Sequence, residues 1–283
     1  MFTTRSPTPP APATEPVPWP GDWCRSALIL VGHGSTRCPG PGRQLRRHAE
    51  TLTRLGLFAE VQTATLVGGP PPGEVLRALT SDRVYVMPMF MCQGQYVRDR
   101  VPTAFEFAGT TGRAKGRTVH VCPPIGLAPE LADLIARRAT ERLAERGIAP
   151  GAAGALLIGH GSATGTASWR ATEAQASRLR AATLFARVET AYLEQRPFLT
   201  DVVSGIRGPL AAVALLAAEG PHAREDIGRM IAESGDRSIA FIGAIGGDVA
   251  MPEIVLQSLR RVSRSIDGGG LNPAPGGGVS LPR

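Results

Sequence analysis

The sequence predicts an α/β protein in which two similar halves, each a doubly wound parallel sheet, face a central cleft. Three observations predict this fold: strands alternate with helices, the strands are continuously apolar, and the order of elements in the first half returns in the second. Continuous apolar strands are typical of parallel sheets that helices cover on both faces. With 283 residues, the chain is long enough for two cores of ordinary domain size.

The first half begins with Ser26–Val31, whose unbroken apolar run predicts a buried strand. Helical spacing of apolar residues follows in Arg43–Gly56, and Gly and Pro mark the breaks between later elements. By the same reasoning we expect strands at 60–67, 84–89 and 119–122, and helices at 73–79, 98–108 and 129–147.

The second half begins after Gly154 and contains the same alternation of elements. We expect strands at 155–158, 188–193, 211–216 and 239–242, and helices at 169–182, 198–206, 223–234 and 252–263. The repeated order predicts an internal duplication.

Matching motifs place this duplication in register. Leu-Ile-Leu-Val-Gly-His-Gly-Ser, with His33, corresponds to Ala-Leu-Leu-Ile-Gly-His-Gly-Ser, with His160. The further matches are Ala64-Thr-Leu-Val67 with Ala191-Tyr-Leu-Glu194, and Tyr96–Pro102 with His222–Gly228. All of these segments end or follow predicted strands, and doubly wound sheets bind ligands beyond the carboxyl ends of their strands.

The two ends of the chain lack the pattern of a folded domain. Met1–Asp22 contains seven prolines, and the last residues are mainly Gly and Pro. We therefore expect a disordered Pro-rich segment at 1–23, a first repeat at 24–150 with a degenerate site, a second repeat at 151–266 with the active site, and a disordered Gly/Pro tail at 267–283.

Composition narrows the class of protein. Apolar residues make up 43% and charged residues 19%, as in a folded globular protein, and no apolar run is long enough to span a membrane. The four cysteines are too widely spaced for a zinc knuckle or a C-x-x-C pair, and the N-terminus has no hydrophobic centre of a secretory signal. The expected location is the cytoplasm.

The net charge of +7 comes from 31 basic residues against 24 acidic ones, and Lys115 is the only lysine. The preference for arginine over lysine is explained equally well by the base composition of the gene and by a function. If the arginines line a cleft, their planar guanidinium groups suit the carboxylates or phosphates of a small polyanion. The basic residues form no tract with interleaved aromatic residues, so we expect no nucleic-acid partner.

The Gly-His-Gly-Ser turns match none of the better-known ligand motifs. Arg37 stands where a dinucleotide fingerprint needs its third glycine, and the chain has neither a P-loop nor a G-x-S-x-G nucleophile motif. A tight turn with a structural histidine explains each of them taken alone. The three matched positions together favour a site, because His160, Glu194 and His222 in the second half correspond to His33, Val67 and Tyr96 in the first.

Two imidazoles and a carboxylate can hold a divalent transition metal and accept protons near neutral pH. Val67 cannot ligate a metal. A duplication that keeps these side chains in one copy only predicts a single active site, in the second half.

The same residues resemble a known family. The two Gly-His-Gly-Ser turns, Val86-Met-Pro-Met-Phe-Met followed by Gly94-x-x-Val97-Arg98 and Val101-Pro102, and Pro123-Pro-Ile-Gly126 with Pro129-Glu-Leu are similar to segments of the sirohydrochlorin chelatases, which are class II tetrapyrrole chelatases. The resemblance covers roughly residues 27 to 263. It implies two α/β halves around a cleft and ATP-independent insertion of a divalent metal into an acidic tetrapyrrole.

The resemblance also implies roles for individual residues. His160, Glu194 and His222 match the family's catalytic and metal-binding positions, whereas Tyr96 replaces the usual histidine of the first half. The metal substrate is Co²⁺, Fe²⁺ or Ni²⁺, which histidine and carboxylate ligands all accept, and no further cofactor is expected. Cleft residues that would contact the substrate are His33, Ser35, Tyr96, Arg98, Ser162 and Arg224. Arg37, Arg98, Arg170 and Arg224 are the best placed to bind substrate carboxylates.

Two other functional classes remain open from the sequence. One is a protein that has kept the chelatase fold and binds a metal or a tetrapyrrole without turnover. The other is a nucleic-acid-binding module, which only the overall charge supports. The sequence does not predict an oligomeric state.

Overall fold

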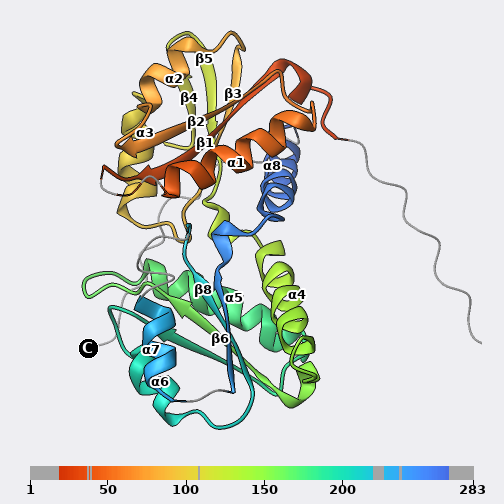
Figure 1. Ribbon diagram of the computed structural model, residues 1–283. Helices are drawn as coiled ribbons and strands as arrows, with labels where there is room; N and C mark the ends of the chain where they lie inside the picture. The colour runs from red at the N-terminus through yellow and green to blue at the C-terminus, as the bar shows by residue number, and fades with distance from the viewer. Residues whose placement is uncertain are drawn as a thin grey trace, which may run out of the picture.

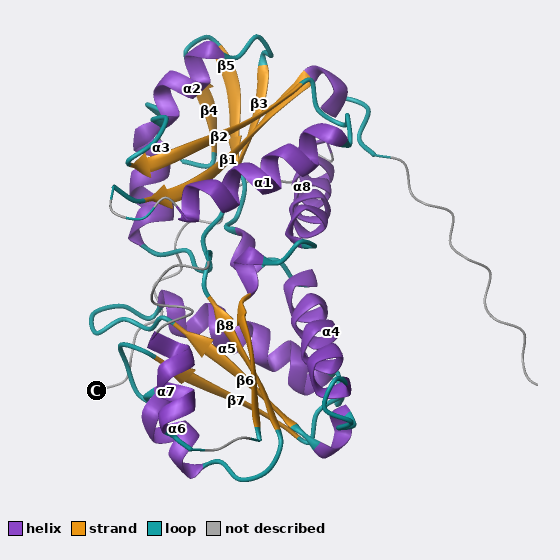
Figure 2. Cartoon of the chain, in the orientation of Figure 1, coloured by secondary structure: helices purple, strands orange, loops and turns teal. Residues whose placement is uncertain are grey.

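Two lobes, each a twisted sheet with helices on both faces, lie one above the other in the computed structural model (Figures 1 and 2). The structure describes residues 19–36, 38, 40–107, 109–218, 226–235 and 238–267. The predicted α/β fold with two parallel-sheet halves is confirmed. None of the helices in these ranges is long and apolar enough to cross a membrane.

The sheet of the first lobe has the strand order β2-β1-β3-β5-β4. All its strand pairs are parallel except β4 with β5. Its strands are β1 (Ser26–Gly34), β2 (Glu60–Val67), β3 (Arg83–Pro88), β4 (Thr111–Ala114) and β5 (Arg117–Val121). Its helices are α1 (Gly40–Arg54), α2 (Pro72–Ala78) and α3 (Val101–Ala104), and a π-helical turn, Tyr96–Arg100, precedes α3.

The sheet of the second lobe is wholly parallel, with the order β7-β6-β8-β9. This order repeats β2-β1-β3-β5, so the duplication extends to the topology of the sheets. The strands are β6 (Gly154–Gly159), β7 (Arg187–Tyr192), β8 (Leu210–Leu215) and β9 (Ile239–Ala244). The helices α5 (Ala167–Ala181), α6 (Leu199–Gly205) and α7 (Ile227–Glu233) follow β6, β7 and β8.

Strand β4 and the helix expected at 98–108 are the main differences from the predicted elements. β4 is short and polar, so it has no apolar run to reveal it. It reaches β5 through Lys115 and Gly116, both with positive φ (50° and 81°), as a two-residue type I′ hairpin requires. The expected helix is reduced to the π-helical turn and the single turn of α3.

Strand side chains alternate between two apolar layers. In β1, Leu28 and Leu30 enter the layer beneath α1, whereas Ala27, Ile29 and Val31 enter the layer beneath α2 and α3. This follows from the period of two in a strand, and it explains why the strands of both lobes are apolar on both faces.

Two helices cover the sheet of the other lobe rather than their own. Helix α4 (Glu130–Ala144) precedes the second repeat but packs against β8, β9 and α5. Helix α8 (Met251–Asp267) ends the second repeat but packs against β3 and α1 of the first lobe (Figure 1). As a result, one buried apolar cluster runs from β1 through α8 and α4 to β6 and β8.

Each crossing segment is fixed by a glutamine of the lobe that it enters. The Nε2 of Gln44, on α1, donates to the carbonyl oxygens of Ala217 and Gly246, at 3.0 and 2.7 Å. The Nε2 of the buried Gln175, on α5, donates to Gly126 and Ala128, at 2.8 and 3.0 Å.

The glycines of these two junctions permit a close approach of backbones. A Cβ at Gly126 would lie 2.1 Å from Met91 O, and one at Gly246 would lie 2.4 Å from Ala217 O. The junctions therefore require glycine as well as glutamine.

Residues 19–23 differ from the expectation of a disordered segment up to residue 23. Trp23 is 1% exposed and stacks on Phe58, and its Nε1 donates to Ser263 Oγ of α8 at 2.9 Å. The start of the described chain thus helps to hold α8 on the first lobe.

Candidate functional site

Each lobe presents one histidine where its central strand ends. His33 is the residue before the last one of β1, and His160 directly follows β6. The glycine after each histidine has a positive φ, 77° at Gly34 and 81° at Gly161. A Cβ at Gly34 would also clash with Val67 O, so the Gly-His-Gly turn needs its second glycine for backbone geometry.

The turn gives both imidazoles the same orientation toward the backbone. His160 Nδ1 lies 3.2 Å from Gly161 O, and His33 Nδ1 lies 2.9 Å from Gly34 O. A carbonyl oxygen only accepts hydrogen bonds, so each Nδ1 carries the proton. In a neutral ring, Nε2 then keeps its lone pair and can bind a metal.

Glu194 is the acidic partner of His160. Its Oε2 lies 3.6 Å from His160 Nδ1, and the two side chains are 51% (His160) and 58% (Glu194) exposed. The backbone brings them together, because the N–H groups of Leu193 and Glu194 donate to His160 O at 3.1 and 3.0 Å. This pair joins two of the three residues predicted for the active site, and both remain accessible to solvent.

The third predicted residue, His222, lies outside the described residues, as do Arg37 and Arg224. Within the described ranges, no group of three His, Cys, Asp or Glu side chains lies close enough to hold a metal ion. The proposed set of ligands thus depends on the segment between β8 and α7.

Two residues that the sequence analysis does not single out hold the turn after His160. Gln195 Oε1 accepts from the N–H of Ser162, and Ser168 Oγ accepts from the N–H of Gly161, both at 3.0 Å. Gln195 directly follows Glu194 in the sequence, but this adjacency does not predict that Gln195 contacts Ser162.

Both serines of the Gly-His-Gly-Ser motifs stabilise the turns in which they lie. Ser35 Oγ accepts from the N–H of Cys38 at 3.0 Å, and Ser162 Oγ accepts from the N–H of Gly165 at 3.1 Å. Each bond joins residue i to residue i+3, so the two lobes use the hydroxyl in the same way.

The first lobe places an aromatic ring where the second has a matched histidine in the sequence. The rings of Tyr96 and His33 meet edge to face, with centroids 4.8 Å apart. The guanidinium of Arg100 lies 4.6 Å from the centroid of Tyr96, as in a cation–π contact. Val67 pairs with Gly34 in the sheet and offers no ligand.

A cavity of about 800 Å³ lies between the lobes. Gln93, Gln95, Arg98 and Asp99 line it from the first lobe, and the segment from Gly161 to Ala171 lines it from the second. Gly161 and Ser162 line this cavity and directly follow His160, although neither His160 nor Glu194 is among the described residues that line it.

Two arginines line this cavity from opposite lobes, Arg98 after β3 and Arg170 on α5. In the part of the chain that the structure describes, neither guanidinium group has a hydrogen-bond or ion-pair partner. Cys92 also lines the cavity, and burial raises the pKa of its thiol, so it stays protonated near neutral pH. The cavity therefore offers unpaired positive charge from both sides.

Comparison with known proteins identifies the fold and its chemistry together. The sequence model of the CbiX family matches residues 27–142 and 154–262, which is most of the chain and includes both sheets. The chain belongs to the CbiX family. Members of this family are sirohydrochlorin chelatases of class II, enzymes that insert a metal into a tetrapyrrole, and this CbiX protein is such a chelatase-like enzyme.

Individual relatives agree with this assignment. The chain is 28% identical over 219 residues to a "probable sirohydrochlorin cobaltochelatase" of Halobacterium salinarum, a match that covers 71% of this chain and 75% of the relative.

Solved structures are similar in fold. A multi-domain protein of Deinococcus radiodurans with structural similarity to chelatases is 26% identical, with a TM-score of 0.71; the match covers 83% of this chain but 55% of that protein. SirB from Bacillus subtilis with Fe³⁺ is 18% identical, with a TM-score of 0.72 and coverage of 86% of this chain and 98% of SirB.

Proposed function

We propose that this CbiX protein inserts Co²⁺, with Fe²⁺ or Ni²⁺ as alternatives, into sirohydrochlorin or a related acidic tetrapyrrole without ATP. In this proposal the reaction takes place in the second lobe, at His160, Glu194 and His222. The observation that carries it is the contact of 3.6 Å between His160 and Glu194 at the carboxyl end of a parallel sheet, beside a cavity between the lobes. In the first lobe Val67 occupies the position that matches Glu194, so no such pair can form there.

The matched residues of the first lobe support a place for His222 beside His160. Tyr96, which corresponds to His222 in the repeat, touches His33, which corresponds to His160. If the second lobe keeps this arrangement, His222 completes a set of two imidazoles and one carboxylate, which suits a divalent transition metal.

The chemistry needs a ligand for the incoming metal and a base for the two pyrrole N–H protons that leave. His160 offers Nε2 as ligand because its proton is on Nδ1. Glu194 Oε2 lies beside Nδ1 of His160 and the side chain is exposed, so it can accept a proton as it stands, and it can bind a metal at Nε2 once its side chain turns toward that atom. We assign metal binding to His160 and His222, and both metal binding and proton acceptance to Glu194.

Substrate binding in this proposal depends on charge. Arg98 and Arg170 would bind carboxylates of the tetrapyrrole from opposite sides of the cavity, because both guanidinium groups lack a partner in the described part of the chain. Arg224 would add a third cation, and His33, Ser35, Tyr96 and Ser162 would form the remaining wall of the cleft.

The preference for Co²⁺ is supported by the cobaltochelatase of Halobacterium salinarum, the relative that is 28% identical. Cobalt insertion leads toward cobalamin, whereas iron insertion leads toward siroheme. The CbiX of denitrifying bacteria, described as the terminal enzyme for biosynthesis of siroheme, and SirB from Bacillus subtilis are both below 25% identity and support the fold alone.

The decisive experiment is an absorbance time course of sirohydrochlorin with Co²⁺, with Ni²⁺ and, anaerobically, with Fe²⁺. Wild-type protein, His160→Ala and a reaction without enzyme are compared at each metal. We expect wild type to accelerate insertion and His160→Ala to lose most of the acceleration, about 100-fold or more.

His33→Ala is the matched control, because His33 has the same turn and the same bond from Nδ1 to the next carbonyl. It should keep most activity. Full activity of His160→Ala would refute the site in the second lobe. A spectral shift on binding without faster insertion would instead indicate a protein that carries the tetrapyrrole without turnover.

A further inference from the structure

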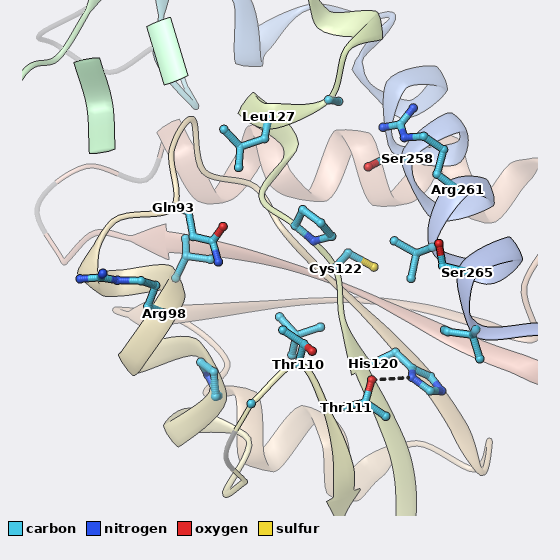
Figure 3. A pocket seen from close by; sticks show the side chains of 18 of the residues that line it. Gln93, Arg98, Thr110, Thr111, His120, Cys122, Leu127, Ser258, Arg261 and Ser265 are labelled. Atoms are coloured by element: carbon cyan, nitrogen blue, oxygen red, sulfur yellow. Dashed lines mark hydrogen bonds between the residues drawn. The ribbon is translucent and has the colours of Figure 1, made fainter. Parts of the chain in front are cut away.

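A second cavity, of about 430 Å³, lies within the first lobe, between the end of β5, the segment leading into α3, and helix α8 (Figure 3). Its volume is in the range of small-molecule sites. It is separate from the His160–Glu194 pair, because its wall consists of residues of the first lobe, the crossing segment and α8.

About half of the described lining residues are apolar. They come from the segment before α3, from β5 and the crossing segment, and from α8: Val97, Pro102, Val121, Pro123, Leu127, Ala128, Pro129, Val262 and Ile266. Such a surface excludes water and favours a ligand with an apolar body.

Two residues of low exposure, Ser258 and Cys122, bring a hydroxyl and a thiol to the wall. Ser258 is 4% exposed and Cys122 is 2% exposed, yet within the described residues neither side chain makes a hydrogen bond. Figure 3 shows both side chains at the cavity. Burial raises the pKa of the Cys122 thiol to about 12, so it stays neutral.

His120, in contrast, is already bonded through Nδ1 to Thr111 Oγ1 at 3.2 Å. Ser258 therefore offers a hydroxyl to a ligand in the cavity, and Cys122 adds a neutral thiol to its apolar surface.

Among the described residues, the charged side chains on the wall are both basic. Arg98 and Arg261 line the cavity, and no aspartate or glutamate of the described residues does. Arg261 pairs with Glu130, so its charge is balanced, whereas Arg98 has no ion-pair partner in the described chain. Uncompensated positive charge thus lies at the edge where Gln93, Arg98 and Leu127 also line the cavity between the lobes.

We propose that this cavity, the α8 pocket, binds a small organic anion with an apolar body, such as an aromatic carboxylate or sulfonate. The apolar body packs between β5 and α8, and the charged group faces Arg98. The α8 pocket has about half the volume of the cavity between the lobes, so its ligand is a smaller molecule than one that fills that cavity. The proposal does not depend on metal insertion.

The probe is 8-anilinonaphthalene-1-sulfonate, an aromatic anion whose fluorescence rises in apolar surroundings, titrated into the full chain. We expect saturable binding of one molecule per chain. N-phenyl-1-naphthylamine has the same ring system without the sulfonate, and we expect it to bind at least 10-fold more weakly.

Ser265→Trp tests the location, because Ser265 lines the pocket from an exposed position that tolerates a larger side chain. We expect the dissociation constant of the anion to rise at least 10-fold. Val262→Phe fills the pocket from the next turn of α8 and serves if the first variant does not fold. Leu55→Trp adds an indole at an exposed site away from the pocket and should leave binding unchanged.

His160→Ala separates this proposal from the proposed function, since it should bind the probe as wild type does while losing metal insertion. Unchanged binding in both pocket-filling variants would overturn the location. Equal binding of the uncharged analogue would overturn the preference for an anion.

Discussion

In both lobes the same kind of turn positions a histidine, but different side chains surround it. At the end of β1 and at the end of β6, a Gly-His-Gly-Ser segment holds the imidazole with Nδ1 on the carbonyl of the next residue. His160 then meets the carboxylate of Glu194, whereas His33 meets the ring of Tyr96.

The features that position the histidine are therefore different from the residues that determine whether it belongs to a metal site. The turn is fixed by backbone geometry and by the serine hydroxyl, which are alike in both lobes. The chemistry depends on the residues that follow the neighbouring strands, Glu194 against Val67. A duplicated sheet can therefore keep its architecture in both copies while one copy loses its ligands.

The largest expected effect comes from removing the second imidazole. We expect His222→Ala to lower the rate of metal insertion about 100-fold, with the fold retained, because a proposed metal ligand is lost. Tyr96→Phe changes the matched position of the first lobe and should lower the rate no more than about 2-fold. A steady-state assay measures the rate of metal insertion by both variants. A large loss of rate in Tyr96→Phe would mean that the first lobe takes part in the reaction.

Glu194→Val gives the second lobe the residue of the first. We expect a loss of about 10- to 100-fold in insertion rate or metal affinity, since the imidazole loses its acidic partner. Insertion kinetics and Co²⁺ titration check this, with Glu189→Val, an exchange on β7 before the site, as the control. Wild-type behaviour of Glu194→Val would remove Glu194 from the mechanism.

The reverse exchange, Val67→Glu with Tyr96→His, gives the first lobe the three residues proposed for the second. We expect the number of Co²⁺ ions bound per chain to rise from one to two, with weaker binding at the new site because its surroundings are not built for a metal. Equilibrium dialysis measures the ratio. The double variant Val67→Gln with Tyr96→His controls for the charge, and an unchanged ratio would show that further residues define the site.

A smaller effect is expected at the arginines that line the cavity from the two lobes. Arg98→Gln and Arg170→Gln should each raise KM for the tetrapyrrole about 10-fold with little change in kcat, a loss of about 1.4 kcal/mol in binding. The salt dependence of KM should become shallower in both. Arg178→Gln, on the exposed face of α5, is the control, and an unchanged KM in both variants would exclude carboxylate binding by this pair.

The smallest effect concerns the two junctions between the lobes. Gln44 and Gln175 occupy matching positions 131 residues apart, and by the same spacing His48 matches Leu179. The junction at Gly246 therefore has a histidine, His48, where the other junction has a leucine. Burial lowers the pKa of His48 below 6.5, although its bond to Gly246 O and the charge of Asp248 partly oppose this. Below pH 6.5 the unfolded chain therefore binds a proton that the folded chain binds less readily, and stability falls as the pH falls toward the lowered pKa.

His48→Leu makes the two junctions alike at this position. We expect wild type to lose up to about 1.4 kcal/mol more stability per pH unit than this variant between pH 6.5 and the lowered pKa. Urea unfolding at pH 7.5 and 5.5 measures the difference. Identical pH dependence in the two proteins would show that His48 does not govern acid stability.

The sequence predicts the sheets because their pattern occurs twice, and it predicts the His160–Glu194 pair because both residues follow neighbouring strands whose motifs are matched in the first half. Strand β2, Glu60–Val67, agrees with its predicted bounds, since its ends coincide with breaks in the pattern. The exchange of α4 and α8 is not predictable from amphipathic spacing, because an apolar face shows that a helix is covered but not by which sheet. The contact of Gln195 with Ser162 depends equally on tertiary geometry.

The crossing of α8 also has a consequence for the order of folding during synthesis. The strands of the first lobe leave the ribosome first, yet the layer that contains Leu28 and Leu30 is completed by a helix that ends at residue 267. Proteins with separate domains commonly fold the N-terminal one while the rest is being made. In this chain that face of the first sheet stays partly uncovered until the second lobe has been synthesised, so the two lobes reach their final structure together.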